Sequence, residues 1–149
     1  MRFKLSVALA VALFCAGAAA RAAPPPGLAP IEGQVVWVDF WASWCVPCRR
    51  SFPWLNSMHR KYAADGLQII AVNLDKDRAL ADKFLAEVPA EFALRFDPAG
   101  DLAKHYGVQA MPSSYLIDRE GRIAAVEEGF HDERATVIEQ RIRALLDRK

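Results

Sequence analysis

Cysteine and histidine are both scarce in this chain of 149 residues, with three of each. A disulfide-stapled scaffold needs several cysteine pairs, and a structural zinc ribbon needs two pairs of ligands at short spacing. Cys45 and Cys48 form one such pair, while Cys15 stands alone near the N-terminus. Arg49, not histidine, follows Cys48, which excludes a c-type haem attachment site. The cysteine content therefore favours redox chemistry.

The chain also lacks an excess of charge of one sign. It has 19 basic and 18 acidic residues, a formal net charge of +1. Three of the basic residues, Arg2, Lys4 and Arg21, lie in an N-terminal stretch without Asp or Glu, so the remainder has 16 basic against 18 acidic residues, a net charge of −2. Such a body has no broad basic field to grip phosphate backbones. We therefore expect protein or small-thiol partners and no nucleic acid.

A long hydrophobic run is missing as well. The longest apolar stretch, residues 5–20, has sixteen residues dominated by alanine, whereas a helix that crosses a bilayer needs about 20. Two basic residues near its start and the Ala-Arg-Ala sequence at 20–22 are typical of a secretory signal. We predict a signal peptide over residues 1–22, export to the periplasm and loss of Cys15 with the signal. An uncleaved membrane anchor is the alternative.

Residues 23–30 are rich in proline and predict an extended linker, so the folded domain is expected over residues 31–149. Its first element is a β-branched and aromatic run at 35–40, which is typical of a buried strand. Apolar residues then recur at helical spacing from Cys45 to about residue 62, with Pro53 expected to kink the helix.

The remaining pattern alternates strands and helices. We expect a strand at 67–74, a helix at 79–87, an extended piece at 92–96, a helix at 100–106, strands at 115–117 and 123–126 joined by a turn at 118–121, and a last helix capped by Asp132 and ending at 146. This order predicts a single α/β domain built around a central sheet.

The pair Cys45-Val46-Pro47-Cys48 follows the first buried strand and opens a helix. Unpaired backbone N–H groups and the helix dipole at that end stabilise a thiolate, so Cys45 is the predicted nucleophile. Cys48 lies three residues later on the same helical face and can close a disulfide as the resolving thiol. Alternatively, the pair is a static staple or half of a metal site.

Asp39 interrupts the apolar run of the first strand. An ionised carboxylate is costly to bury, so burial should raise the pKa of Asp39 and allow it to carry protons near neutral pH. The alternative is a partly exposed aspartate on an edge strand. Trp41 and Trp44 could form an apolar docking surface beside the cysteines, although Trp41 could equally serve packing.

These residues carry a family resemblance. The sequence VDFWASWCVPC at 38–48 resembles the active-site segment of the thioredoxin superfamily, in particular its bacterial TlpA/ResA/DsbE branch. The likeness continues through AVNLD at 71–75, FDP at 96–98 and GVQAMPSSYLID at 107–118. It implies a thioredoxin-like α/β fold, a central mixed β-sheet flanked by helices with a TlpA-type helical insertion, and thiol–disulfide oxidoreductase activity without a cofactor.

The resemblance also implies roles for single residues. Pro112 corresponds to a cis-proline that faces the disulfide and presents the backbone of Met111 to a client peptide. Without the resemblance a trans bond would be expected, because only about one X–Pro bond in twenty is cis. Asp39 corresponds to the buried acid of thioredoxin. Many relatives of the branch carry instead a glutamate in the loop after the next strand, where this chain has Lys76.

The leading functional hypothesis is dithiol–disulfide exchange with client proteins, in which Cys45 attacks and Cys48 resolves. The resemblance implies a reductant that acts in cytochrome c maturation or on respiratory metal-site cysteines and is recharged by a membrane electron donor. A copper-binding or metal-delivery module that uses both thiolates is the alternative. It needs a third soft or imidazole ligand near the pair, which the sequence does not place there. A peroxidase of the peroxiredoxin kind would need a lone peroxidatic cysteine in a Thr/Pro setting, which this sequence lacks.

Overall fold

The computed structural model describes Leu28 and residues 33–148. The expected signal peptide over 1–22, Cys15 and all of the expected linker except Leu28 lie outside the described residues. Among the described residues, no helix combines the length and the apolar character that a membrane crossing requires.

The core of the domain is a five-stranded mixed sheet with the strand order β3-β2-β1-β4-β5. The central strand β1 (Val35–Trp41) pairs in parallel with β2 (Leu67–Asn73) and antiparallel with β4 (Ser113–Ile117). The edges are β3 (Ala93–Phe96), parallel to β2, and β5 (Ile123–Glu128), antiparallel to β4. All seven residues of β1 are buried, as its near-continuous apolar run predicts for a strand covered on both faces.

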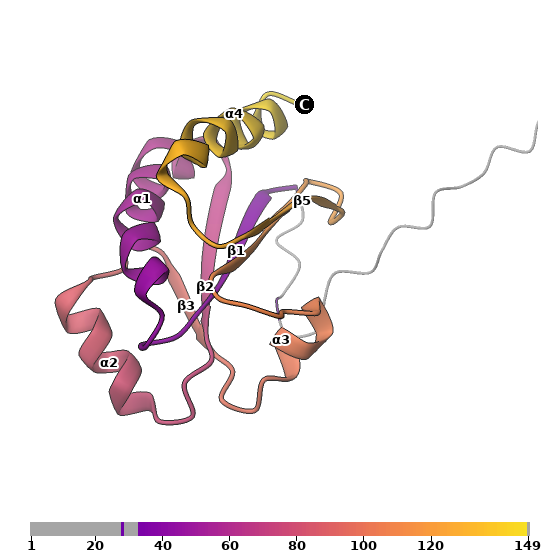
Figure 1. Cartoon of the computed structure of the whole chain (residues 1–149). Helices are drawn as coiled ribbons and strands as arrows, with labels where there is room; N and C mark the ends of the chain where they lie inside the picture. The colour runs from indigo at the N-terminus through magenta and orange to yellow at the C-terminus, as the bar shows by residue number, and fades with distance from the viewer. Residues whose placement is uncertain (1–27, 29–32, 149) are drawn as a thin grey trace, which may run out of the picture.

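Helices cover both faces of this sheet (Figure 1). On one face, α1 (Val46–Tyr62), α2 (Arg78–Glu87) and α4 (Ala135–Leu146) contribute to the larger apolar cluster. On the other face, α3 (Asp101–Tyr106) packs through Ala103. The prediction of an α/β sandwich is confirmed.

Side chains of β1 alternate between the two faces and so divide the core into two clusters. Val35, Trp37 and Trp41 pack in the larger cluster with Cys45 and Cys48. Val36, Val38 and Phe40 pack in the smaller cluster beneath α3. In the larger cluster the ring centroid of Trp41 lies 5.0 Å from that of Phe52 and 4.7 Å from that of Phe84. Trp41 is fully buried, so it serves packing and not docking.

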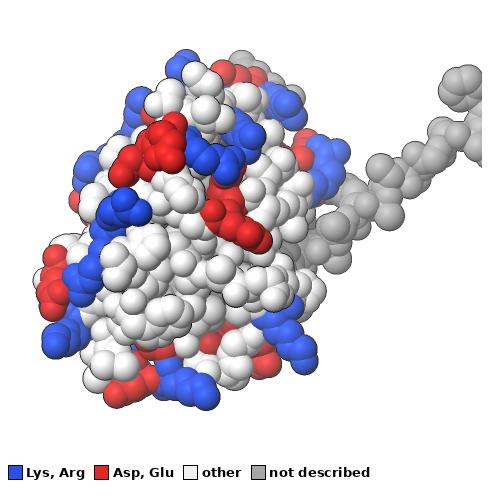
Figure 2. Space-filling model, in the orientation of Figure 1, with Lys and Arg blue, Asp and Glu red and all other residues white. Residues whose placement is uncertain are grey.

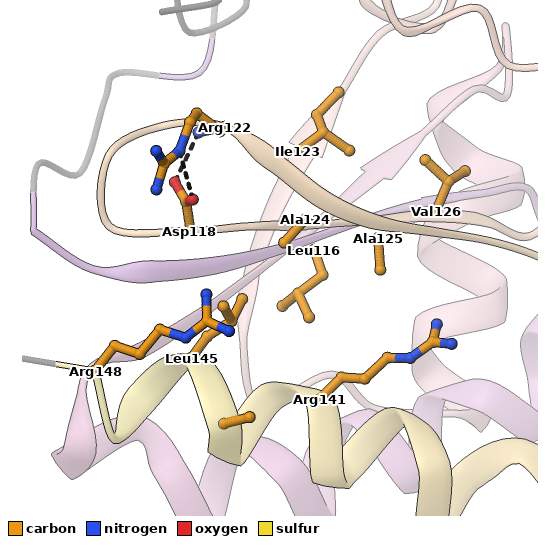
Figure 3. Close-up of a pocket in the computed structure, with 11 residues that line it drawn as sticks. Leu116, Asp118, Arg122, Ile123, Ala124, Ala125, Val126, Arg141, Leu145 and Arg148 are labelled. Carbon is orange, nitrogen blue, oxygen red and sulfur yellow. Dashed lines mark hydrogen bonds and ion pairs between the residues drawn. The ribbon is translucent and has the colours of Figure 1, made fainter. Parts of the chain in front are cut away.

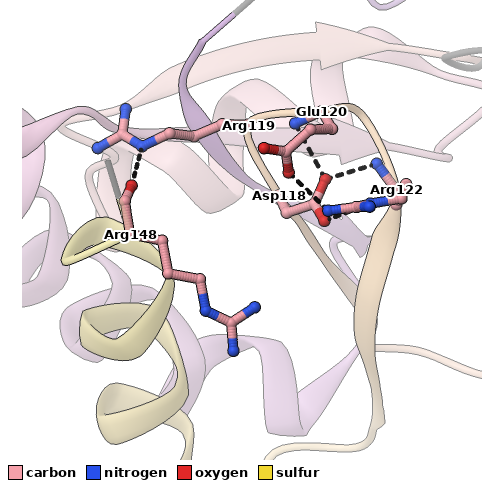
Figure 4. Close-up of polar contacts among 5 residues, drawn as sticks. All are labelled: Asp118, Arg119, Glu120, Arg122 and Arg148. Carbon is pink, nitrogen blue, oxygen red and sulfur yellow. Dashed lines mark hydrogen bonds and ion pairs between the residues drawn. The ribbon is translucent and has the colours of Figure 1, made fainter.

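The turn expected at 118–121 joins β4 to β5 and is organised by Asp118 (Figure 4). Its carboxylate accepts hydrogen bonds from the backbone N–H groups of Glu120 and Arg122 and from Arg122 Nε at 2.8 Å. Burial alone would raise the pKa of Asp118, but the hydrogen bonds from Arg122 and Glu120 and the charge of Arg122 outweigh it, so the pKa lies below its ordinary value.

The boundary predicted for the last helix is wrong. Asp132 does not cap the last helix, because residues Asp132–Arg134 form a 3₁₀ turn and α4 begins only at Ala135, without a side-chain cap. Two acidic side chains of this turn lie near basic side chains instead. Asp132 Oδ2 is 3.6 Å from a guanidinium nitrogen of Arg50, and Glu133 Oε1 is 3.8 Å from His131 Nδ1. A residue type that favours a helix start does not by itself decide between an α and a 3₁₀ turn.

Charges of both signs are interspersed around the face seen in Figure 2, with an uncharged stretch across its lower centre. An open groove of about 680 Å³ lies between β5 and α4 (Figure 3). Its lining includes Leu116, Ile123 and Leu145 with Arg141 and Arg148, and none of the residues that the sequence predicts to be functional.

Candidate functional site

Cys45 and Cys48 form a disulfide at the start of α1, just after the loop that follows β1. Cys45 is the N-cap residue of α1, and its Sγ accepts a hydrogen bond from the backbone N–H of Cys48 at 3.3 Å. Because the free N–H groups and the positive end of the helix dipole lie at this sulfur, the reduced Cys45 is favoured as a thiolate. The predicted placement of the pair on a helix N-terminus is confirmed.

Asp75 anchors the loop that leads into Cys45. Its carboxylate accepts hydrogen bonds from the backbone N–H and the Oγ of Ser43, both at 2.8 Å, and from Asn73 Nδ2 at 2.7 Å. Ser43 follows β1 and Asp75 follows β2, so two neighbouring parallel strands bring them to the same edge of the sheet. This contact holds the backbone just before Cys45 in place.

Asp39 is buried on the face of β1 that packs against α1, between Trp37 and Trp41. Its Oδ1 accepts a hydrogen bond from Ser114 Oγ at 2.6 Å, and its Oδ2 has no hydrogen-bond partner among the described residues. Burial raises the pKa of Asp39 to about 7, although hydrogen bonds from the side chains of Ser114 and Trp37 lower it. The prediction of a buried strand aspartate with a raised pKa is confirmed, and the alternative of an exposed edge residue is wrong.

The loop before β4 supplies two more of the expected residues, Met111 and Pro112. The Met111–Pro112 peptide bond is cis, as the resemblance implies. Pro112 is buried, and Met111 is partly buried against the cluster that contains Cys45 and Cys48. Gly129 donates its backbone N–H to the carbonyl of Pro112 at 2.8 Å, which ties this loop to the end of β5.

An exposed apolar surface flanks the disulfide. Trp44 is 68% exposed and Val46 is 71% exposed, which is unusual for large apolar side chains. Trp44 also lines a shallow groove of about 230 Å³. The other lining residues come from the Cys45 loop, α1 and α2: Ser43, Arg49, Leu80, Lys83, Phe84 and Glu87.

This fold and this arrangement of residues agree with the comparisons to known proteins. The model of the Redoxin family matches residues 27–142. The chain belongs to the Redoxin family. The resemblance to the thioredoxin superfamily and its ResA/DsbE branch is thereby confirmed, as is the thioredoxin-like fold.

Among sequence relatives, the Redoxin-family chain is 33% identical over 96 residues to the thiol-disulfide oxidoreductase ResA of Bacillus thuringiensis, which covers 64% of this chain and 56% of that protein. It is 28% identical over 102 residues to ResA of Bacillus subtilis, covering 68% of this chain and 57% of that protein. The chain thus spans little more than half the length of these two relatives.

Among solved structures, the Redoxin-family chain resembles one from Chlorobium tepidum, provisionally assigned as a thiol:disulfide interchange protein DsbE. The identity is 53% and the TM-score 0.76, covering 77% of this chain and 82% of that one. StoA from Bacillus subtilis is 26% identical with a TM-score of 0.65, covering 74% of this chain and 84% of StoA.

The two arginines that follow Cys48 in this Redoxin-family chain have ordinary partners. Arg49 pairs with Glu87 at 2.8 Å and stacks over Phe84, and Arg50 donates to the carbonyl of Phe130 at 3.4 Å.

Across the part of the chain that the structure describes, no three His, Cys, Asp or Glu side chains gather in a way that could hold a metal ion.

The roles of two residues at the site, Asp75 and Ser114, were not predicted from the sequence. In the sequence, Asp75 was identified only as the last residue of the family-like segment at 71–75, although its position after β2, level with the end of β1, signals that it can reach Ser43. Ser114 has no sequence signal of its own, because its contact with Asp39 depends on the antiparallel pairing of β1 with β4.

Proposed function

We propose that this chain is an exported thiol–disulfide oxidoreductase that exchanges dithiol for disulfide with client proteins. The observation that carries the proposal is the Cys45–Cys48 disulfide at the N-terminus of α1, with a buried acid beneath the same helix. Names of relatives in the ResA and DsbE group support the activity. The expected signal peptide at 1–22 and the Ala-Arg-Ala cleavage sequence support export to the periplasm.

The geometry supports a two-step reaction. In the reduced protein the Cys45 thiolate attacks one sulfur of a client disulfide, so a mixed disulfide forms and one client thiolate leaves. Cys48 then loses its proton to the Asp39 carboxylate, attacks Cys45 Sγ and releases the second client thiolate. The client has gained two electrons, and the protein has been oxidised to the Cys45–Cys48 disulfide.

The surface around the disulfide supports a peptide as the substrate. In the proposed complex, an extended client segment lies along the backbone of Met111 beside Pro112, while an apolar client side chain contacts Trp44. The exposed fraction of Trp44 supports this role, because burying so large an apolar surface favours association.

We further propose the reductant direction, in which clients are disulfides of apocytochrome c or of respiratory metal-site proteins and a membrane electron donor regenerates the dithiol. The support is the ResA/DsbE resemblance alone. Reduction potentials decide direction, and a difference of about 30 mV already corresponds to about 1.4 kcal/mol.

Trapping of mixed disulfides tests the proposed activity. The Cys48→Ala variant keeps the attacking thiol and lacks the resolving one, so it should accumulate client proteins bound through Cys45. The Cys45→Ala variant is the matched control and should accumulate few. Non-reducing gel electrophoresis of periplasmic extracts with mass spectrometry of the bands provides the measurement. Equal trapping by both variants would contradict the assigned order of attack.

The proposed proton acceptor has its own test. Asp39→Asn keeps the shape of the side chain and removes its titration, so resolution of a preformed mixed disulfide should slow near neutral pH while attack by Cys45 stays nearly unchanged. Stopped-flow measurement of both half-reactions against pH separates the two. Unchanged resolution rates between pH 6 and 9 would remove Asp39 from the mechanism and leave the cysteine pair in place.

A further inference from the structure

A row of polar side chains crosses the sheet beneath α1 and α4. Asp39 on β1, Ser114 on β4 and Glu127 on β5 are aligned neighbours in the strand register. Directly opposed residues of antiparallel strands share a face, so all three side chains lie on the side of the sheet that carries the cysteines. Each is at least nine-tenths buried, with exposed fractions of 1%, 4% and 4%. Three adjacent buried polar residues inside an apolar core are costly unless they are paired.

The partners of the row divide into two groups. At the outer end, Glu127 is held by Arg134 at 2.7 Å and by Arg141 at 2.6 Å, one guanidinium on each carboxylate oxygen. Its negative charge is therefore neutralised before it can act on Asp39. At the inner end, Ser114 Oγ donates to Asp39 Oδ1 at 2.6 Å, while Asp39 Oδ2 is buried without a partner among the described residues.

Each element packed against Asp39 contributes neighbours of a definite kind. Cys48 and Tyr62 on α1 and Cys45 at its N-cap are the titratable side chains of the core cluster on this face, Ser114 on β4 is a neutral donor, and Ala71 on β2 is apolar. Glu127 on β5 is the nearest charged member of the row, compensated by arginines of the 3₁₀ turn and α4. Ser114 therefore donates the 2.6 Å hydrogen bond that reaches the Asp39 carboxylate from another strand, while the Trp37 side chain on β1 also lowers the pKa of Asp39 by hydrogen bonding.

We propose that Ser114 is a positioning residue, whose hydroxyl fixes Oδ1 of Asp39, leaves Oδ2 to receive the proton of Cys48, and thereby sets the pH at which the mixed disulfide is resolved. This inference rests on the proposed role of Asp39 and extends it to a residue of another strand. In the step concerned, the S–H bond of Cys48 breaks and an O–H bond forms on Asp39 Oδ2. The Cys48 thiolate then forms the S–S bond to Cys45 as the Cys45–client bond breaks, and the client thiolate takes a proton from solvent.

The direction of the effect follows from the charge of the acceptor. A hydroxyl that donates to a carboxylate stabilises the ionised form more than the neutral form, so it makes Asp39 a proton acceptor at lower pH. Loss of one hydrogen bond to a charged group should shift the midpoint of the pH–rate profile upward by about one pH unit. At the original midpoint, near pH 7, the resolution rate should then fall about fivefold.

Three variants test the proposal. Ser114→Ala removes the donor and should shift the midpoint of resolution upward, whereas Ser114→Thr keeps a hydroxyl and should restore the original midpoint. Ser113→Ala is the matched control, because it removes a neighbouring buried hydroxyl whose bond goes to the carbonyl of Ala110. The midpoint of the pH–rate profile of the Ser113→Ala variant should not move, even if its resolution rate changes. A Ser114→Ala profile that falls equally at every pH would mean a merely structural role and would overturn the proposal.

A direct titration keeps the test independent of catalysis. The Asp39 carboxyl carbon can be followed by ¹³C NMR in the oxidised protein, and the pKa of Asp39 should be higher in Ser114→Ala than in the unchanged chain. An identical titration in both would overturn the role of Ser114. If Asp39→Asn slows resolution but Ser114→Ala moves neither readout, only the role of Ser114 fails. If Asp39→Asn leaves resolution unchanged, the proton-acceptor role fails, and this inference with it.

Discussion

Replacing Asp39 with asparagine should make the folded protein more stable, relative to the unchanged protein, as the pH rises, with a net gain above about pH 7. Burial raises the pKa of this carboxyl from 3.8 in its ordinary state to about 7 in the folded state. At about 1.36 kcal/mol per unit, a shift of about three units corresponds to about 4 kcal/mol of unfolding free energy. Asparagine does not titrate, so it escapes this cost.

The pH window follows from the two pKa values. Below pH 3.8 the carboxyl is neutral in both states and costs nothing by ionisation. Between 3.8 and about 7 the unfolded state releases the proton while the folded state keeps it, so the stability of the unchanged protein falls as the pH rises. Above about 7 the full cost is present. The buried amide N–H₂ of the variant adds its own penalty of about 1–3 kcal/mol, which does not depend on pH.

Denaturant unfolding of both oxidised proteins across this window measures the difference. The free energy of the variant minus that of the unchanged protein should rise by about 4 kcal/mol from the acidic to the alkaline end. Asp118→Asn is the control of opposite sign. Hydrogen bonds and the charge of Arg122 hold the pKa of Asp118 below its ordinary value, so this variant should be destabilised above pH 3.8 and recover as the pH falls. A pH-independent difference for Asp39→Asn would refute the reasoning.

Two further predictions concern the loop and the surface around the cysteines. Asp75→Asn should loosen the segment before Cys45, because it weakens two hydrogen bonds to Ser43, and should destabilise the protein by about 1–3 kcal/mol; faster amide hydrogen exchange at Ser43 would report it, and unchanged exchange would contradict it. Trp44→Ala should leave stability within about 0.5 kcal/mol, since the side chain is 68% exposed. It should slow exchange with a protein disulfide but not with oxidised glutathione, and equal slowing of both would argue against a docking role.

Local sequence was enough to predict the elements that build the site. The run from Val35 to Trp41 is apolar on both faces except at Asp39, and this pattern is characteristic of a central strand covered on both sides. The cysteine pair spans one helical turn, so its placement at the start of α1 follows from chain order alone. The cis peptide before Pro112 came from the resemblance, because an X–Pro sequence by itself favours trans.

The chain near β5 and α4 was harder to predict. The strand was expected to end at residue 126, but it continues through Glu127 and Glu128. Glutamate is depleted in strands because a buried carboxylate needs a partner. Glu127 obtains two, from Arg134 and Arg141, and these contacts form only once α4 has packed across the sheet. A pattern of single residues cannot show such a pairing in advance.

Asp39 likewise combines a property that local sequence predicts with one that depends on packing between distant segments. Its burial is a local property of an apolar strand, and burial alone determines that its pKa rises. How far it rises depends on Trp37 in the same strand and, more strongly, on Ser114, which is 75 residues away in sequence and arrives through the pairing of β1 with β4. The proposed nucleophile Cys45 and the proposed acid Asp39 are therefore readable from one short segment, whereas the strongest hydrogen bond on that acid comes from a strand that the segment does not contain. A one-residue slip in the pairing of β4 would turn Ser114 to the opposite face and remove its bond to Asp39.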